Sequence, residues 1–123
     1  MSDVIRISEQ GKRQLIILKR TTKIDQWNIL CRWALCSSIQ DSAPLTRFEL
    51  GPISNIEMSW DTFAGPFSPI FTALMKSKTQ PTNQEPLFNS NEFFIYHIHR
   101  GITILVNKKP TIEKFILKSL LCN

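Results

Sequence analysis

Several residue patterns on which enzymes depend are scarce in this chain. With only four glycines, it has no glycine-rich phosphate loop, no GxGxxG fingerprint and no GxSxG nucleophile elbow. Its three cysteines, Cys31, Cys36 and Cys122, form neither a CxxC pair nor an even set for disulfides. Since Cys31 and Cys36 lie within an apolar helical pattern, we expect small, buried, reduced thiols. These absences argue against catalysis.

Potential metal ligands are also few and scattered. The ten acidic residues do not cluster as the Mg²⁺ site of a nuclease requires, and Glu57 with Asp61 forms only a weak pair. His97 and His99 form an HxH pair, but no cysteine or carboxylate stands at a spacing that completes a zinc site. We therefore expect no metal and no cofactor, with one histidine packed or hydrogen-bonded beside Arg100. A DNA-nicking enzyme that uses Glu57 and Asp61 is an alternative.

Long hydrophobic runs are absent as well. No apolar stretch reaches the ~18 residues of a membrane span, and no charged start followed by an apolar run indicates a signal peptide. A cytoplasmic location without membrane association is the expectation. The 123 residues, 42% of them hydrophobic, suit one globular domain over 1–123 with its own core.

Positive charge is what the chain has in excess. The formal net charge is +5, and it is unevenly distributed. Residues 1–23 hold six Lys or Arg against two acidic residues, residues 24–99 hold four against seven, and residues 100–123 hold five against one. Both ends are therefore basic and the middle is acidic, which favours a polyanionic partner.

The first 38 residues predict a strand followed by two helices. Residues 4–8 alternate, with Ile5 and Ile7 on one face, and Ser8 is suited to cap a helix over 9–22. At ~100° per residue, the basic side chains of this helix share a surface away from its apolar face. The residues expected to contact DNA phosphates are Arg6, Lys12, Arg13, Lys19, Arg20 and Lys23, with Lys108, Lys109, Lys114 and Lys118 as secondary candidates.

A second helix over 26–38, with Asp25 as its N-cap, is apolar on two sides. In so short a chain, we expect another copy of the protein to cover the second side. The residues expected at this interface of a homo-oligomer are Trp27, Leu30, Trp33, Ala34 and Leu35.

The rest of the chain is less regular. Residues 39–54 predict a loop with an extended piece at 48–50, and 55–61 are ambiguous, although Ile56, Met58 and Trp60 alternate as in a strand. A helix is expected over 68–77 and a flexible surface loop over 76–91. Residues 92–106 suit either a strand or a helix, and we favour a helix. A last helix is expected from Thr111.

Several strings resemble the DndE family, the small subunit of bacterial DNA phosphorothioation systems. They are residues 4–15 (VIRISEQGKRQL), 27–36 (WNILCRWALC), 48–60 (FELGPISNIEMSW), 62–65 (TFAG) and 99–101 (HRG). The resemblance implies a mainly α protein with a ribbon-helix-helix-like N-terminal half and additional C-terminal helices, assembled as a tetramer. It also implies binding to double-stranded DNA, with a preference for nicked duplex. Partner proteins of the system would perform the sulfur chemistry, in which sulfur replaces a non-bridging phosphate oxygen.

The resemblance departs at one position. The family usually has glycine where this chain has Lys23, between the first two helices. Glycine there would permit a left-handed backbone, so lysine costs roughly 1 kcal/mol or forces a different turn. It also adds positive charge beside Lys19 and Arg20.

These observations together predict a non-catalytic, DNA-binding oligomer that contacts the phosphate backbone. One alternative is a ribbon-helix-helix repressor, in which strands of two chains pair and Arg6 and Ser8 read base edges. The nicking enzyme described above is another. A third is a scaffold that binds only proteins.

Overall fold

Helices make up most of the structure, as the sequence predicted. The computed structural model describes residues 4–79 and 90–108. Its elements in chain order are β1 (Val4–Ser8), α1 (Glu9–Thr22), α2 (Trp27–Gln40), β2 (Ile53–Ser59), α3 (Trp60–Ala64), the 3-10 turn η1 (Gly65–Phe67), α4 (Ser68–Thr79) and α5 (Ser90–Lys108). Residues 92–106 are therefore helical, and the helix expected over 68–77 is also confirmed. The strand and helix expected over 4–8 and 9–22 have the predicted bounds.

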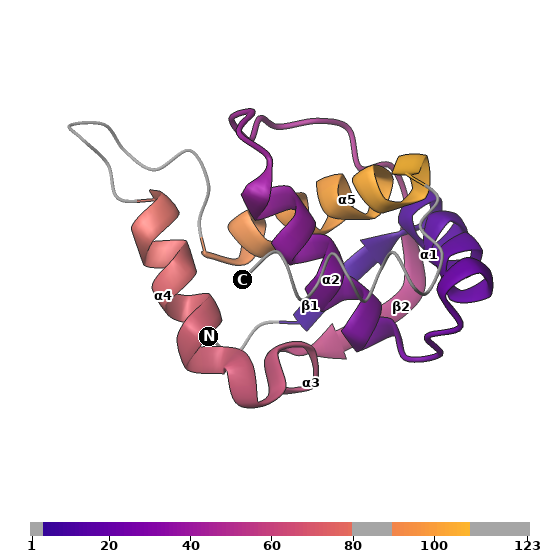
Figure 1. Ribbon diagram of the computed structural model, residues 1–123, viewed down its shortest axis with the longest axis horizontal. Coiled ribbons are helices and arrows are strands. Elements are labelled where there is room, and N and C mark those ends of the chain that lie inside the picture. Colours follow the sequence, from indigo (N-terminus) through magenta and orange to yellow (C-terminus); the bar gives the residue numbers. More distant parts are fainter. Residues whose placement is uncertain (1–3, 80–89, 109–123) are drawn as a thin grey trace.

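The centre of the molecule is the contact between α2 and α5, which cross with little space between their backbones (Figure 1). A Cβ atom built on Gly101 of α5 would lie 1.7 Å from the carbonyl oxygen of Ala34 on α2. Glycine is therefore required at this crossing. Side chains on both sides of it are fully buried, among them Leu30 and Leu35 on α2 and Ile98 on α5. Helix α5 of the same chain thus covers the side of α2 that holds Leu30, Ala34 and Leu35, whereas on the second apolar side Trp33 is half-buried and Cys36 is exposed.

The two strands form an antiparallel ribbon within the chain, with Ile5 opposite Met58 and Arg6 opposite Glu57. Ile5 and Ile7 point into the core, as the alternation predicted. The register shifts between Arg6 and Ser8. Since β1 pairs with β2 of its own chain, its partner differs from that of a ribbon-helix-helix strand, which pairs with a second chain. That detail of the fold stays a prediction.

The loop expected after α2 is confirmed, since residues 41–52 form no helix or strand, and its side chains bind α5: the Phe48 ring meets Tyr96 edge-on at 5.1 Å, and Arg47 forms a salt bridge with Glu92 at 2.6 Å. One local expectation was wrong. Asp25 is not the N-cap of α2. Gln26 holds that position, and its side chain makes no capping hydrogen bond.

The bounds of other helices and strands differ from the prediction because of local interactions. The alternation of Ile56 and Met58 does mark β2, but Trp60 begins α3, because Ser59 caps that helix by accepting from the Thr62 amide at 3.1 Å. Helix α4 continues to Thr79, so the first residues of the loop expected over 76–91 are helical. The remainder of that loop at 80–89 and the helix expected from Thr111 lie outside the described residues. No helix in the described ranges is both long and apolar enough to cross a membrane.

Candidate nucleic-acid interface

Helix α1 is anchored so that one side faces the core and the other faces solvent. Ser8 caps it: the Ser8 hydroxyl accepts from the Gly11 amide at 3.0 Å, and Glu9 places a carboxylate in the first turn, where the helix dipole favours it. Leu15 and Leu18 are fully buried on the inner side. The inner side fixes the rotation of the helix about its axis, and hence the direction in which its basic residues point.

The opposite side holds the cations. We call Lys12, Arg13, Lys19, Arg20 and Lys23 the α1 basic surface. Arg13, Arg20 and Lys23 are exposed, while Lys12 and Lys19 are half-buried. None of the five forms a salt bridge with any residue in the described ranges. Their charge is therefore available to an external anion along about 16 Å of helix.

The two half-buried lysines have contacts that orient them. Lys12 donates to the side-chain oxygen of Asn55 on β2, at 2.7 Å. The Lys19 ammonium lies 5.1 Å from the centre of the Trp27 ring, within range of a cation–π contact. Neither contact removes the charge. Asn55 and Trp27 are thus neighbours of the α1 basic surface that the periodicity of α1 alone could not identify.

Arg6, by contrast, has an acidic partner. Its Nε donates to Glu57 across the β1–β2 ribbon at 3.2 Å. Both side chains are more than half exposed, so this pair contributes little to stability. It nevertheless partly neutralises Arg6. Ser8, the other candidate for base reading, is 4% exposed and occupied as the cap of α1.

Lys23 ends α1 in a left-handed conformation, with φ of 64°. It is the one non-glycine residue with positive φ in the described ranges. Its amide donates to the carbonyl of Lys19 at 3.0 Å, which closes the helix as a C-terminal glycine normally does. A side chain in this conformation costs about 1–2 kcal/mol. The backbone at position 23 therefore has the conformation that suits glycine, and the lysine side chain is strained in it.

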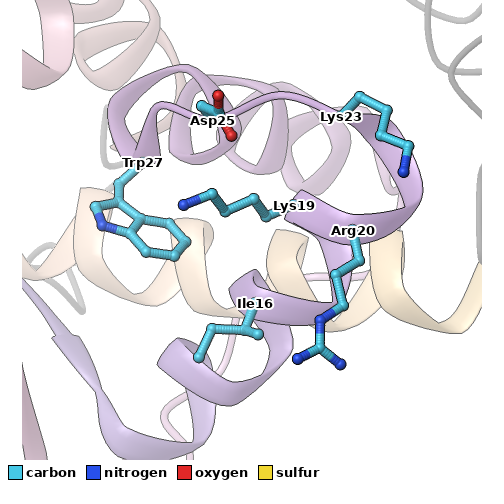
Figure 2. Close-up of a pocket in the computed structure, with 6 residues that line it drawn as sticks. All are labelled: Ile16, Lys19, Arg20, Lys23, Asp25 and Trp27. Carbon is cyan, nitrogen blue, oxygen red and sulfur yellow. The ribbon is translucent and has the colours of Figure 1, made fainter.

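An open hollow lies where α1 ends and α2 begins. It has a volume of about 620 Å³ and is lined by Ile16, Lys19, Arg20, Lys23, Asp25 and Trp27. Figure 2 shows Lys19 extending from α1 towards the Trp27 ring, while Arg20 and Lys23 leave the same end of the helix in other directions. Because no side chain caps α2, the positive end of its dipole adds to the charge of this corner. Lys19 and Arg20 in the last turn of α1 also interact favourably with that helix's negative end, a structural role that needs no ligand.

The other predicted cations lie elsewhere. Lys108 is exposed near the end of α5, beside a second hollow lined by residues that include Ser37 and Asp41 of the α2 end. Lys109, Lys114 and Lys118 lie outside the described residues.

Both histidines of α5 are occupied by internal hydrogen bonds. His99 Nδ1 lies 2.8 Å from the Ile95 carbonyl and must carry the proton, so Nε2 accepts the Ser8 amide at 3.0 Å. Burial lowers the pKa of His99 from its ordinary 6.5, and the backbone hydrogen bond to Ile95 opposes this in part. His97 Nδ1 lies 2.7 Å from the Ser38 hydroxyl, on the other side of the helix.

Arg100 contacts the same Ser38 hydroxyl as His97, so a histidine does form a hydrogen bond beside Arg100, as expected. Arg100 donates to the Ser38 hydroxyl and carbonyl, both at 2.7 Å, and to the Ala43 carbonyl at 2.9 Å. These contacts satisfy the Ser38 carbonyl near the end of α2 and the Ala43 carbonyl in the loop that follows. Among residues 4–79 and 90–108, no three His, Cys, Asp or Glu side chains gather as a potential metal site.

The cysteines differ from each other. Cys31 is buried as expected, and burial raises the pKa of its thiol to about 12. The expectation for Cys36 was wrong, because it lies on the outer side of α2 and is exposed. Cys122 lies outside the described residues.

The residues expected at an interface between copies also divide into two groups. Leu30, Ala34 and Leu35 are fully buried within one chain, so their packing is accounted for without a second copy. Trp27 and Trp33 are half-buried and pack partly on the core. Of these two tryptophans, Trp27 lines the hollow at the end of α1, whereas Trp33 does not.

Most of the strings that carried the family resemblance meet one another in space. Arg32 donates to the carbonyls of Phe63 at 2.5 Å and Thr62 at 3.2 Å, so the second string holds the TFAG string at the end of α3. Gly65 has a φ of 53°, and a Cβ there would lie 2.6 Å from Arg32. The HRG string supplies His99, Arg100 and Gly101, each in one of the contacts described above. These strings therefore form a scaffold, and the basic residues lie at its edge.

The comparison with protein families confirms the resemblance that these strings carried. The profile of the family described as DNA sulphur modification protein DndE matches residues 4–113. No individually curated protein matches the chain. Because the match covers nearly the whole sequence, the chain belongs to the DndE family of DNA sulphur modification proteins.

Proposed function

We propose that this chain is a non-catalytic, double-stranded DNA-binding subunit of its DNA sulfur modification system. The observation that carries the proposal is the α1 basic surface, whose five cations, three of them exposed and two half-buried, form no salt bridge with any described residue. A solvated helix face normally mixes both signs of charge. Family membership adds a reason why the polyanion should be DNA.

The contacts are expected to be with phosphates. Lysine and arginine side chains on one stretch of helix fix a protein on the duplex without reading its sequence. Ser8, which a base-reading ribbon would present to DNA, is buried as a helix cap. If all five cations bind phosphates, the logarithm of the binding constant falls with the logarithm of salt concentration with a slope near −4.5 for each chain.

Assembly into a homo-oligomer, a tetramer by the family resemblance, would repeat this surface. Trp33 is the candidate interface residue, because it is half-buried in the single chain and lies away from the basic hollow. A preference for nicked duplex belongs to the same proposal. A nick makes DNA easier to bend, and several copies of the surface could then contact one site.

The sulfur chemistry is assigned to partner proteins of the system. A sulfur carrier needs an accessible thiolate. The Cys31 thiol is buried and its pKa is raised to about 12, so it does not supply one. Cys36 is exposed, and we expect Cys36→Ser to retain DNA binding and to support sulfur modification in cells.

Charge reversal tests the proposal. Lys19→Glu with Lys23→Glu should weaken binding to unrelated duplex sequences alike and should make the salt dependence shallower. Lys76→Glu is the control that matches each of these reversals made singly, since Lys76 is an exposed lysine on α4, far from α1 (Figure 1). Equal binding by the α1 variant and the control would overturn the assignment of the surface. Failure of the unmodified protein to bind duplex at any salt concentration would favour a protein-only scaffold.

A further inference from the structure

The hollow at the end of α1 has the composition of a nucleotide site rather than of a simple anion site. Of its six lining side chains, three are cationic, one is a carboxylate and one is an indole. Its volume of about 620 Å³ lies within the range of small-molecule sites. Phosphate alone would need only the cations, so the aromatic ring and the carboxylate call for a ligand with further parts.

Trp27 offers a fixed platform at this site. It is the first residue of α2, and its ring packs partly against the core, so its position is set by the fold. The Lys19 ammonium lies 5.1 Å from the ring centre. Lysine has a flexible stem, and a cation over an exposed ring is held more weakly than a stacked nucleobase. A base can therefore replace Lys19 on the ring, and the displaced ammonium remains beside the phosphates.

The position of Trp27 at the protein surface also requires that a base stacked on it be unpaired. In an intact duplex, both faces of each base are stacked on neighbouring pairs, so a paired base offers only its edges to a protein and cannot stack on a side chain. Only an unpaired nucleotide can place its base on Trp27 while its phosphates meet nearby cations. Arg20 and Lys23 extend away from Trp27 (Figure 2), so their positive charges lie where the phosphates of a DNA strand would continue beyond the stacked base.

We propose that the hollow between α1 and α2 binds one unpaired nucleotide of a DNA strand, with its base stacked on Trp27 and its phosphates beside Lys19, Arg20 and Lys23. This inference rests on the proposed DNA-binding function and assigns a ligand class to one end of the same surface. Asp25 at the rim lowers the net charge of the hollow, which disfavours free polyphosphates relative to a strand that carries one charge per phosphate.

The test uses two substitutions of one residue. Trp27→Phe keeps an aromatic platform, whereas Trp27→Leu keeps an apolar side chain but cannot stack. For single-stranded oligo(dT), Trp27→Leu should bind at least about fivefold more weakly than the unmodified chain, and Trp27→Phe should bind nearly as well. The loss that Trp27→Leu causes in binding oligo(dT) should exceed any loss that it causes in binding an intact duplex, where Lys19 loses only its contact with the ring. Oligo(dT) should also quench the tryptophan fluorescence of the unmodified chain, and Trp27→Phe should lose that quenching.

The possible results separate the two proposals. If duplex binds but oligo(dT) causes no quenching, or binds equally to the Phe and Leu variants, the nucleotide site is refuted while the duplex-binding function stands. If neither DNA binds the unmodified chain, both proposals fail together. Thermal unfolding checks that each variant is folded. Should Trp27→Leu be unfolded, the comparison of quenching between the unmodified chain and Trp27→Phe still decides, because loss of quenching supports the site and persistence of quenching refutes it.

Discussion

His99 accepts the backbone amide of Ser8 through Nε2 at a distance of 3.0 Å, and Ser8 is also the residue whose hydroxyl caps α1. One imidazole on α5 therefore holds the junction between β1 and the helix that carries the basic surface. This role requires the neutral ring, since a protonated imidazole has no lone pair with which to accept.

Acid should weaken the fold through this contact. Burial lowers the pKa of His99 below 6.5, so between that folded-state pKa and 6.5 the unfolded chain binds more protons than the folded chain does. The stabilising contribution of His99 is complete above pH 6.5 and decreases as pH falls through this window. Urea unfolding at a series of pH values from 7.5 downward should show the decrease as a lower free energy of unfolding.

Substitution of His99 isolates its share of the effect. His99→Gln offers a side-chain oxygen as acceptor but does not titrate, so its free energy of unfolding should depend less on pH than that of the unmodified chain. His99→Phe leaves the Ser8 amide without an acceptor and should cost about 1–3 kcal/mol at pH 7.5. An unchanged pH dependence in His99→Gln would show that other groups cause the acid sensitivity.

The sequence correctly predicted those features of the fold that depend on interactions between residues close together in the chain. The cap at Ser8, the bounds of α1 and the two inward residues of β1 depend on neighbours within a few positions, and all were confirmed. Contacts between distant segments were not predictable in this way. The packing of α5 on α2 depends on Gly101, which lies against Ala34 and is 67 positions later in the chain. No periodicity within α2 indicates that partner.

The same division applies to the candidate site. The cations of α1 are visible in the sequence because helical spacing alone brings them to one side. The residues that contact these cations are not visible in the sequence, because they come from other elements: Asn55 contacts Lys12 from β2, and Trp27 contacts Lys19 from the next helix. The left-handed backbone at Lys23 was only one of two outcomes that the sequence left open, because a lysine gives no signal for positive φ.

Gly101→Ala should be among the most destabilising single changes in the chain. The added methyl group would lie 1.7 Å from the Ala34 carbonyl oxygen, which is backbone and cannot turn aside, so α2 and α5 must separate. We expect a loss of about 3 kcal/mol or more in urea unfolding, or no folded protein.

Gly51→Ala is the control for this substitution. Gly51 differs from Gly101 in having a positive φ, at 76°, and nothing lies within 4 Å of the added Cβ. It should therefore cost only the conformational penalty of about 1–2 kcal/mol. Similar losses in the two variants would contradict the close helix crossing.

The two described cysteines should react at different rates with an alkylating agent. Cys36 is exposed, whereas Cys31 is buried with a thiol pKa of about 12, so at pH 8 Cys31 is both inaccessible and protonated. In a Cys122→Ser background, mass spectrometry after brief iodoacetamide treatment should find one added group, at Cys36. Two groups should appear in urea. Rapid labelling of Cys31 without urea would contradict the burial of α2 beneath α5.

Lys23→Gly should separate stability from DNA binding, because the residue is strained in a conformation that glycine adopts without cost. Glycine at φ 64° relieves the strain of about 1–2 kcal/mol, which the greater freedom of glycine in the unfolded chain offsets in part, so the free energy of unfolding should stay the same or rise. The lost cation should at the same time weaken duplex binding and reduce the salt slope by about one.

Lys23→Ala is the matched control, since it removes the same charge but keeps a Cβ in the left-handed conformation. It should bind DNA as weakly as Lys23→Gly while gaining no stability. If Lys23→Gly gains stability and binds duplex as well as the unmodified chain, the lysine has no role in holding DNA, and its strain needs another explanation. If both variants lose stability equally, the Lys23 side chain supports the fold through its own contacts. Higher stability of Lys23→Gly than of Lys23→Ala, together with equally weakened duplex binding in both variants, would identify Lys23 as a residue retained for an anionic ligand at a cost to the fold.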